Sequence, residues 1–138
     1  MARKPTEPLI EPHEFASVEE IDRGIAKLNR RIADIEALDV EAAALEHTGE
    51  DKAVEENIRE SIREVFGSNS PEFHEHQYIT IYAGPRWMGM SEESVIEGKQ
   101  HGKKQVTGVL NGLIGRLRES VKNSRRGSRP NPRHIFVS

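Results

Sequence analysis

Two histidines flanking a glutamate, His74-Glu75-His76, form the densest group of potential metal ligands in this chain. Imidazole and carboxylate groups bind zinc and related transition metals. In a β-strand, His74 and His76 would share a face and could reach one ion. In a helix they would point about 200° apart and could not. Spacing identifies no third ligand, so we interpret them as exposed polar side chains and predict no metal site.

The remaining patterns give no support for catalysis. Glu55-Glu56 and Glu92-Glu93 are carboxylate pairs by adjacency only, and adjacent helical residues do not converge on one reacting atom. We interpret these four as solvated helix charges. The chain lacks the glycine patterns of phosphate-binding loops and the G-x-S-x-G elbow of a nucleophilic serine. We therefore predict no catalytic residue, no cofactor site and no enzymatic activity in this chain alone.

A loop after residue 83 offers a different chemistry, the binding of a ligand. Gly84–Met90 contains the only tryptophan of the chain and an arginine. Aromatic rings and a guanidinium can hold a ligand together, by stacking and by charged hydrogen bonds. Our candidate ligand-binding residues are Tyr82, Arg86 and Trp87.

The charge of the chain is divided unevenly along its length. The body through Val121 carries 15 basic and 23 acidic residues, whereas the remainder carries five basic residues and no acidic one. Prolines and glycines interrupt this basic tail, as is typical of a linker. Nucleic-acid binding remains an alternative, because clustered arginines bind phosphates, and its candidate residues are Arg125, Arg126, Arg129 and Arg133.

Helical periodicity dominates the elements that would position these residues. Ser17-Val-Glu-Glu20 has the form of a capping box. Behind it, apolar residues follow at spacings of 4, 3, 4 and 3, the pattern of a helix–helix seam: Ile21, Ile25, Leu28, Ile32 and Ile35. The seam either packs against the chain's own second helix or pairs with another chain, so we expect these residues to build the core and interfaces.

Two further helices are expected. One runs from about residue 51 to 66 and ends at Gly67, so it forms an antiparallel hairpin with the first. The other begins after Ser91 and runs to about residue 122. Its glycine pair, Gly98 and Gly102, indicates either a kink near residue 102 or the close approach of another helix. Between the two, residues 78–83 are rich in β-formers, and the sequence leaves helix and short β-hairpin open.

Composition limits the class and compartment. The chain has 138 residues, 35% of them hydrophobic and 31% charged, which fits one small helical domain with a large solvated surface. It has no cysteine, which fits a reducing cytoplasm. The N-terminus lacks the apolar core of a signal peptide, and no apolar run is long enough to span a bilayer. We expect a cytoplasmic protein that does not contact membranes.

Two stretches resemble bacterial proteins that carry TIR-like domains. His134-Ile-Phe-Val-Ser138, behind the basic linker, is similar to the first strand of prokaryotic TIR-like domains. The helix that ends in Phe66-Gly67, with its Ser-Asn-Ser-Pro-Glu turn, resembles a segment preceding such domains in some bacterial nucleotide-binding proteins. The serine-capped stretch Met90–Gly102, with its spaced glycine pair, fits the same pattern.

The resemblance implies an N-terminal accessory region of a bacterial TIR-like effector, ending at the first TIR-like strand. In that family the TIR-like domain often cleaves NAD, and self-association brings active sites together, commonly in antiphage defence. The family's catalytic glutamate and nucleotide pocket lie downstream of that strand. No site residue is therefore carried over to this chain.

We therefore expect a mainly α-helical protein. Its parts are a flexible segment (1–16), a helical domain (17–122), a basic linker (123–133) and the start of a downstream domain (134–138). Its expected function is that of a non-catalytic oligomerisation or regulatory module, with a second copy and the downstream TIR-like domain as partners. The alternatives are a stand-alone module that senses a ligand or protein, and a nucleic-acid-binding protein.

Overall fold

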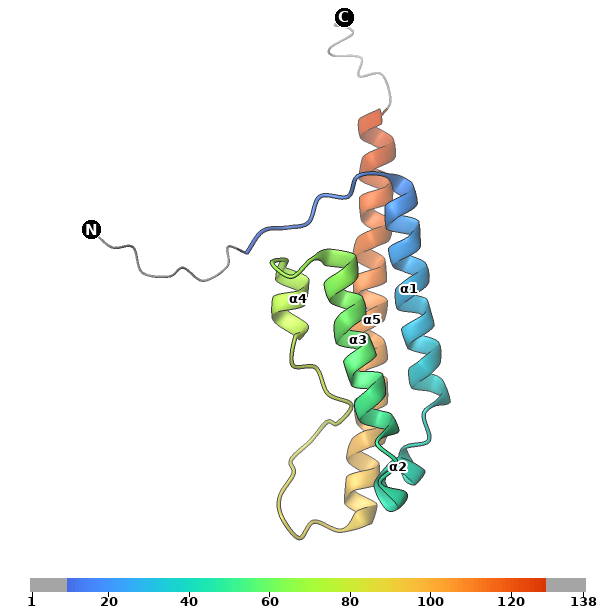
Figure 1. Cartoon of the computed structure of the whole chain (residues 1–138), viewed down its shortest axis with the longest axis vertical. Coiled ribbons are helices and arrows are strands. Elements are labelled where there is room, and N and C mark those ends of the chain that lie inside the picture. Colours follow the sequence, from blue (N-terminus) through green and yellow to red (C-terminus); the bar gives the residue numbers. More distant parts are fainter. Residues whose placement is uncertain (1–9, 129–138) are drawn as a thin grey trace, which may run out of the picture.

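The computed structural model describes the backbone of residues 10–128 and the side chains of residues 10–123. Five helices make up most of this region (Figure 1): α1 (Val18–Ala37), α2 (Val40–Glu46), α3 (Glu50–Phe66), α4 (Pro71–His76) and α5 (Glu92–Ser128). The prediction of a mainly α-helical fold is confirmed. No strand occurs among the described residues, so the alternative of a short β-hairpin in the middle is not supported.

The three long helices form a bundle. Helix α1 runs antiparallel to α3, as the predicted hairpin requires, and α5 runs antiparallel to α1 (Figure 1). Helices α3 and α5 are consequently parallel, so the chain must return between them, through α4 and residues 77–91. Helix α2 and the first turns of α3 and α5 lie together at one end of the bundle (Figure 1). We call this end the base. No helix of the described region is long and apolar enough to cross a membrane.

Helix α1 begins at the predicted cap. The Ser17 hydroxyl accepts a hydrogen bond from the Glu20 amide at 3.1 Å. In a capping box the Glu20 carboxylate would accept from the Ser17 amide. Here it accepts instead from the amide of the preceding residue, Ala16, at 2.5 Å, and it also lies 3.0 Å from the His13 ring. The hydrogen bond from Ala16, followed by that from His13, lowers the pKa of the Glu20 carboxyl. The start of α1 is therefore stabilised by both partners.

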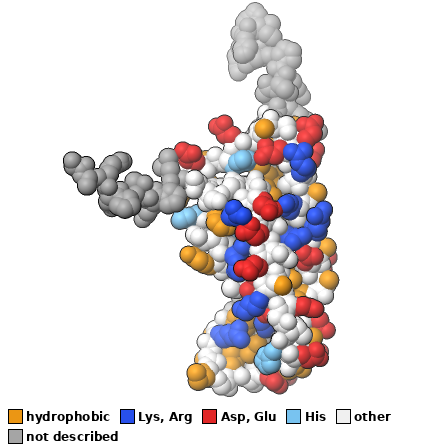
Figure 2. Space-filling view, in the orientation of Figure 1, with side chains coloured by type: hydrophobic (Ala, Val, Ile, Leu, Met, Phe, Trp, Pro, Cys, Tyr) orange, Lys and Arg blue, Asp and Glu red, His pale blue; other side chains and the backbone are white. Residues whose placement is uncertain are grey.

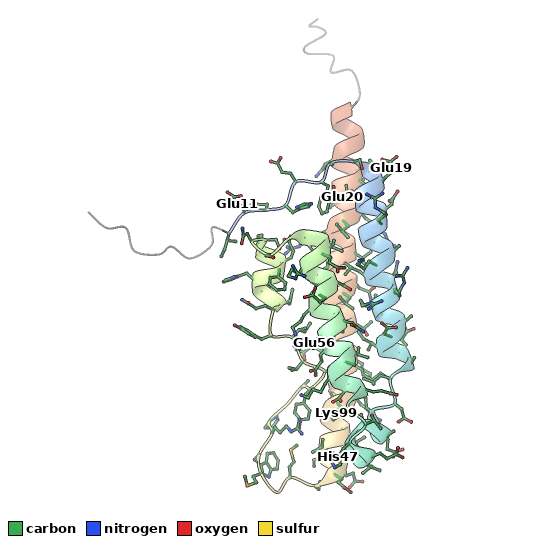
Figure 3. The ribbon with its side chains drawn as sticks, viewed as in Figure 1. Glu11, Glu19, Glu20, His47, Glu56 and Lys99 are labelled. Atoms are coloured by element: carbon green, nitrogen blue, oxygen red, sulfur yellow. The ribbon has the colours of Figure 1, made fainter. Side chains whose placement is uncertain are left out.

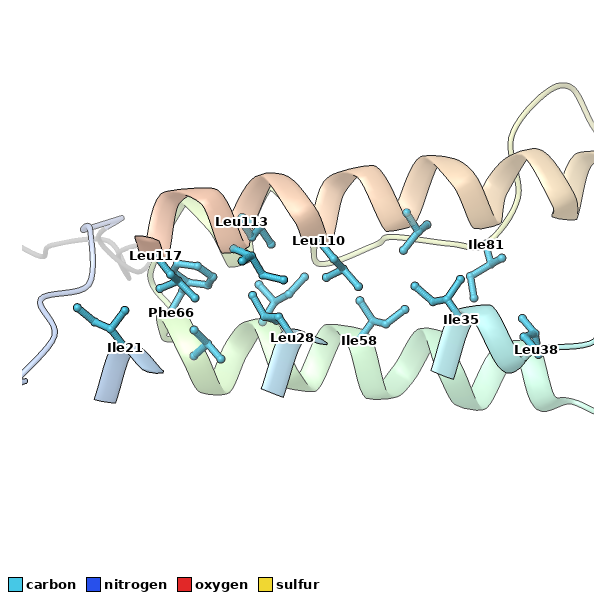
Figure 4. Close-up of a cluster of buried hydrophobic side chains, with 14 of the residues drawn as sticks. Ile21, Leu28, Ile35, Leu38, Ile58, Phe66, Ile81, Leu110, Leu113 and Leu117 are labelled. Carbon is cyan, nitrogen blue, oxygen red and sulfur yellow. The ribbon is translucent and has the colours of Figure 1, made fainter. Parts of the chain in front are cut away.

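The predicted seam lies inside the bundle of a single chain. Ile21, Leu28 and Ile35 are at most 2% exposed, whereas Ile25 and Ile32 are partly buried at the edge of the same cluster. Their neighbours come from α3 and α5 (Figure 4), including Ile58, Ile62, Phe66, Leu110, Leu113 and Leu117. Of the two alternatives for the seam, packing within the chain is the one that the structure adopts. On the visible outer face, charged side chains of both signs alternate (Figure 2).

Helix α5 is longer than predicted and has no break. It continues to Ser128 rather than ending near residue 122, because the first residues of the basic tail contain no proline before Pro130 to oppose a helix. Residues 123–128 are thus helical, although we expected a linker to begin at 123. Of the two alternatives for the pair Gly98 and Gly102, a kink or a close contact, the close contact is the one observed.

The element that contacts this glycine pair is an extended segment, residues 79–83, which we call the strap. A Cβ atom at Gly98 would lie 2.3 Å from the Tyr82 ring, and one at Gly102 would lie 2.3 Å from the Tyr82 backbone nitrogen. The alternative of a close contact named another helix as the partner, and in this respect it is wrong, because the contacting residues are Ile81 and Tyr82 of the strap. A strap can lie this close because its backbone, unlike a helix, presents little bulk to the groove on α5.

Several backbone groups of the strap form hydrogen bonds although no strand lies beside it. Arg59 donates to the Ile79 carbonyl at 2.9 Å, and the Ile81 amide donates to the Glu55 carboxylate at 2.8 Å. The Ala83 amide donates to the Gly98 carbonyl of α5 at 2.9 Å. Side chains and a helix carbonyl therefore replace the partner strand that a β-rich sequence usually needs. Ile81, 1% exposed, anchors the strap in the core.

Candidate functional site

A pocket of about 350 Å³ opens at the base of the bundle, which we call the base pocket. Helix α2, the start of α3, the loop before α5 and the first turns of α5 all contribute to its wall. Two of its residues, His47 and Lys99, are labelled at this end of the molecule in Figure 3. The full lining is Ala43, Ala44, His47, Gly49, Asp51, Lys52, Arg86, Met90, Glu92, Val95 and Lys99.

A buried ion pair forms part of this lining. Asp51 on α3 and Lys99 on α5 are 5% and 7% exposed, and the Lys99 ammonium donates to the Asp51 carboxylate. Burial raises the pKa of Asp51, but the hydrogen bond and charge of Lys99 outweigh it, so the pKa lies below its ordinary value. The lowered pKa keeps the Asp51 carboxyl ionised beside the Lys99 ammonium, and the pairing of the two groups compensates the cost of burying them.

Glu55 is also buried, which contradicts the prediction that it is a solvated charge. It is 4% exposed, and one carboxylate oxygen accepts the Ile81 amide of the strap. Its other oxygen lies 3.8 Å from the Lys52 ammonium. Its neighbour Glu56 is exposed, as predicted. The carboxylate of Glu55 therefore holds the strap rather than facing solvent.

The sequence carries a signal for these buried charges that the composition and motifs alone do not reveal. Asp51 and Glu55 begin a 4-3-4-3 spacing that Ile58, Ile62 and Val65 continue, so both stand in line with the core positions of α3. Lys99 lies seven residues before Val106, hence on the core face of α5. Opposite charges at core positions of two helices predict a buried ion pair.

The three candidate ligand-binding residues are only partly brought together. The Arg86 guanidinium lies over the Tyr82 ring, 5.0 Å from its centre, and the Tyr82 hydroxyl donates to the Pro85 carbonyl at 2.9 Å. Arg86 lines the base pocket, but Tyr82 and Trp87 are not part of its lining. Trp87 and Met88 are 58% and 98% exposed in the neighbouring loop. The pocket therefore has the predicted cation without the predicted aromatic wall.

The histidine cluster lies on helix α4. In a helix His74 and His76, two positions apart, point in different directions. No group of three His, Cys, Asp or Glu side chains in the described region is arranged to hold a metal ion. Of the basic tail, Arg125 and Arg126 lie on the last turns of α5. Arg129, Arg133 and the strand expected at 134–138 lie outside the described residues.

Comparison with known proteins finds no relative of this chain. No known protein family matches the chain, and neither a curated protein nor a solved structure shows significant similarity to it.

Proposed function

We propose that the chain is a non-catalytic regulatory module that links the base pocket to a TIR-like domain following the basic linker. The observation that carries this proposal is the continuity of α5. Its first turns supply Glu92, Val95 and Lys99 to the pocket, and its last turns lead into the linker. The TIR-like part of the proposal rests on the sequence resemblance alone.

An α-helix of this length is a rigid connection. With 37 residues and a rise of 1.5 Å each, α5 spans about 55 Å. Helix α1 packs along it and ties it to the rest of the bundle (Figure 1). A shift of the first turns of α5 would therefore reach its far end with little loss, which is what a regulatory module requires.

A test of the non-catalytic assignment uses NAD, the substrate that the resemblance implies. We expect the 138-residue chain to leave NAD intact, whereas the product of the reading frame continued beyond codon 138 consumes it. NAD cleavage by the 138-residue chain would overturn the non-catalytic assignment. A continued reading frame without a TIR-like domain would overturn the proposed linkage.

Self-association is the second part of the proposal, and its interface must lie outside the seam. Leu28 is fully buried, so Leu28→Asp is expected to unfold the chain rather than to separate subunits. Light scattering of the unaltered chain over a range of concentrations tests self-association directly. We expect a mass that rises with concentration, and a constant monomer mass at high concentration would contradict this part of the proposal.

A ligand-sensing module is the second candidate function, and the base pocket favours it. Concave pockets of about 300–1,000 Å³ with a few convergent polar groups are typical of small-molecule sites. The base pocket falls at the lower end of this range, and its lining includes the predicted Arg86. This function is compatible with the first, because the ligand would be the signal that the module transmits.

A further inference from the structure

We infer that the base pocket binds a small organic anion with an apolar portion. This inference rests on the proposed ligand-sensing function and specifies its ligand class. Three features of the lining support it: one more basic than acidic residue, a guanidinium without a carboxylate partner, and an apolar wall.

The sign of the ligand follows from the ionisable residues in the lining. Lys52, Arg86 and Lys99 are basic, whereas Asp51 and Glu92 are acidic. Asp51 and Lys99 neutralise each other in the buried pair. Two cations then face one carboxylate, and this occurs in a body whose acidic residues outnumber its basic ones. Lys52 also lies 3.8 Å from the Glu55 carboxylate behind the lining, so the cation of the pocket that has no carboxylate partner among the described residues is Arg86, and such a group attracts anions.

Arg86 is the residue best prepared to contact the anion. It makes no ion pair with any carboxylate that the structure describes. Its guanidinium is instead placed over the Tyr82 ring, an arrangement that orients the group while leaving its hydrogen-bond donors free. A guanidinium binds carboxylates and phosphates through two parallel hydrogen bonds. Lys52 supplies a second cation, held only loosely by Glu55 at 3.8 Å.

The rest of the lining determines what else the ligand carries. Ala43, Ala44, Met90 and Val95 contribute an apolar wall, which inorganic phosphate would leave uncovered. Burying apolar surface there adds roughly 25 cal/mol per Å² to binding. The small volume restricts the ligand to the size of a small metabolite. A compact organic carboxylate or phosphate ester meets all three conditions.

Phenyl phosphate is a suitable probe, and three compounds serve as matched comparisons. Inorganic phosphate keeps the charge, benzyl alcohol keeps the ring, and benzylamine reverses the charge. We would follow binding to the 138-residue chain by calorimetry and by the fluorescence of Trp87, which lies next to Arg86 in the loop. We expect phenyl phosphate to bind with saturation and at least tenfold more tightly than each of the three comparison compounds.

Two variants test the residues. Arg86→Gln and Lys52→Gln remove a cation each from exposed side chains, and each should weaken phenyl phosphate binding about tenfold or more, as expected for a charged hydrogen bond. Arg63→Gln is the matched control, because Arg63 is an exposed arginine of α3 paired with Glu60 and outside the pocket. Its affinity should equal that of the unaltered chain. If Arg86→Gln and Lys52→Gln bind phenyl phosphate as tightly as Arg63→Gln and the unaltered chain do, the inference is overturned.

The comparison compounds separate the inference from the function on which it rests. If benzylamine binds with saturation and phenyl phosphate does not, the pocket is a ligand site but the inferred anion is wrong. If none of the four compounds binds at concentrations up to about 10 mM, beyond the millimolar Kd of a weak specific ligand, both the anion and the ligand-sensing function are refuted.

Discussion

The contact between the strap and α5 can be tested with two glycine-to-alanine substitutions in the same helix. At Gly102 the added Cβ would lie 2.3 Å from the Tyr82 nitrogen and 2.5 Å from the Ile81 carbonyl carbon. Backbone atoms cannot rotate away as a side chain can, so the strap must move. At Gly108 an added Cβ would meet no atom within 4 Å. The two variants therefore share one chemical change and differ only in what surrounds it.

The expected magnitudes follow from these surroundings. Replacing an interior helix glycine with alanine stabilises the helix by about 0.5–1 kcal/mol, and Gly108→Ala should gain that amount. Gly102→Ala gains it too, but displacing the strap breaks the bonds of Ile81 to Glu55 and of Ala83 to Gly98. The first, to a charged group, contributes about 1.5–3 kcal/mol and the second about 0.5–1.5. The two lost bonds together cost about 2–4.5 kcal/mol, so the net effect should be a loss of about 1–4 kcal/mol.

Urea unfolding followed by circular dichroism measures the free energy of unfolding of both variants. Hydrogen exchange gives a local reading, since the Ala83 amide should lose protection in Gly102→Ala and keep it in Gly108→Ala. A Gly102→Ala variant at least as stable as the unaltered chain would refute the packing of the strap on α5. Destabilisation by Gly108→Ala would show that the outer face of α5 is covered.

Three further predictions concern the ion pair and the first helix cap. Asp51→Asn leaves the buried Lys99 without a partner and should lower the free energy of unfolding by about 3–5 kcal/mol; an unchanged urea midpoint would contradict the buried pair. Because the pKa of Asp51 is lowered in the folded state, its stabilisation is complete above about pH 3.9 and disappears as the pH falls further. Urea midpoints measured from pH 5 to 3 should therefore fall more steeply for the unaltered chain than for Asp51→Asn, and parallel curves would refute this assignment. Ser17→Ala should cost about 1 kcal/mol by calorimetry or urea unfolding, and no change would mean that another group caps α1.

The sequence predicted those parts of the fold that depend on local patterns. The cap at Ser17, the stop at Gly67 and the seam from Ile21 to Ile35 each follow from residues within one or two helical turns. These patterns determine where a helix begins and which face it buries. Such local patterns do not identify what packs against the buried face. For the seam of α1 they therefore allow both packing within the chain and pairing with another chain.

The candidate site was less predictable, because its residues come together only in the folded chain. Arg86 was identified from its residue type, and it does line the base pocket. Asp51 and Lys99 are 48 residues apart, and their pairing depends on α3 and α5 being parallel. That arrangement in turn requires the strap, whose β-forming sequence indicated an extended backbone but not its partners. The strap bonds to the Glu55 carboxylate and to the Gly98 carbonyl of α5. No sequence pattern announces such a combination of hydrogen-bond partners.

The parallel arrangement of α3 and α5 also has a consequence for synthesis on the ribosome. The core joins Ile21 near the start of the chain to Leu117 on the last helix, so it cannot close until about 96 further residues have been made. At roughly 5–20 residues per second, this takes about 5–20 s. During that time the apolar residues of α1 and α3 lack the third helix that covers them. The nascent hairpin is therefore the stage at which the apolar face of this chain is uncovered and aggregation is most favoured.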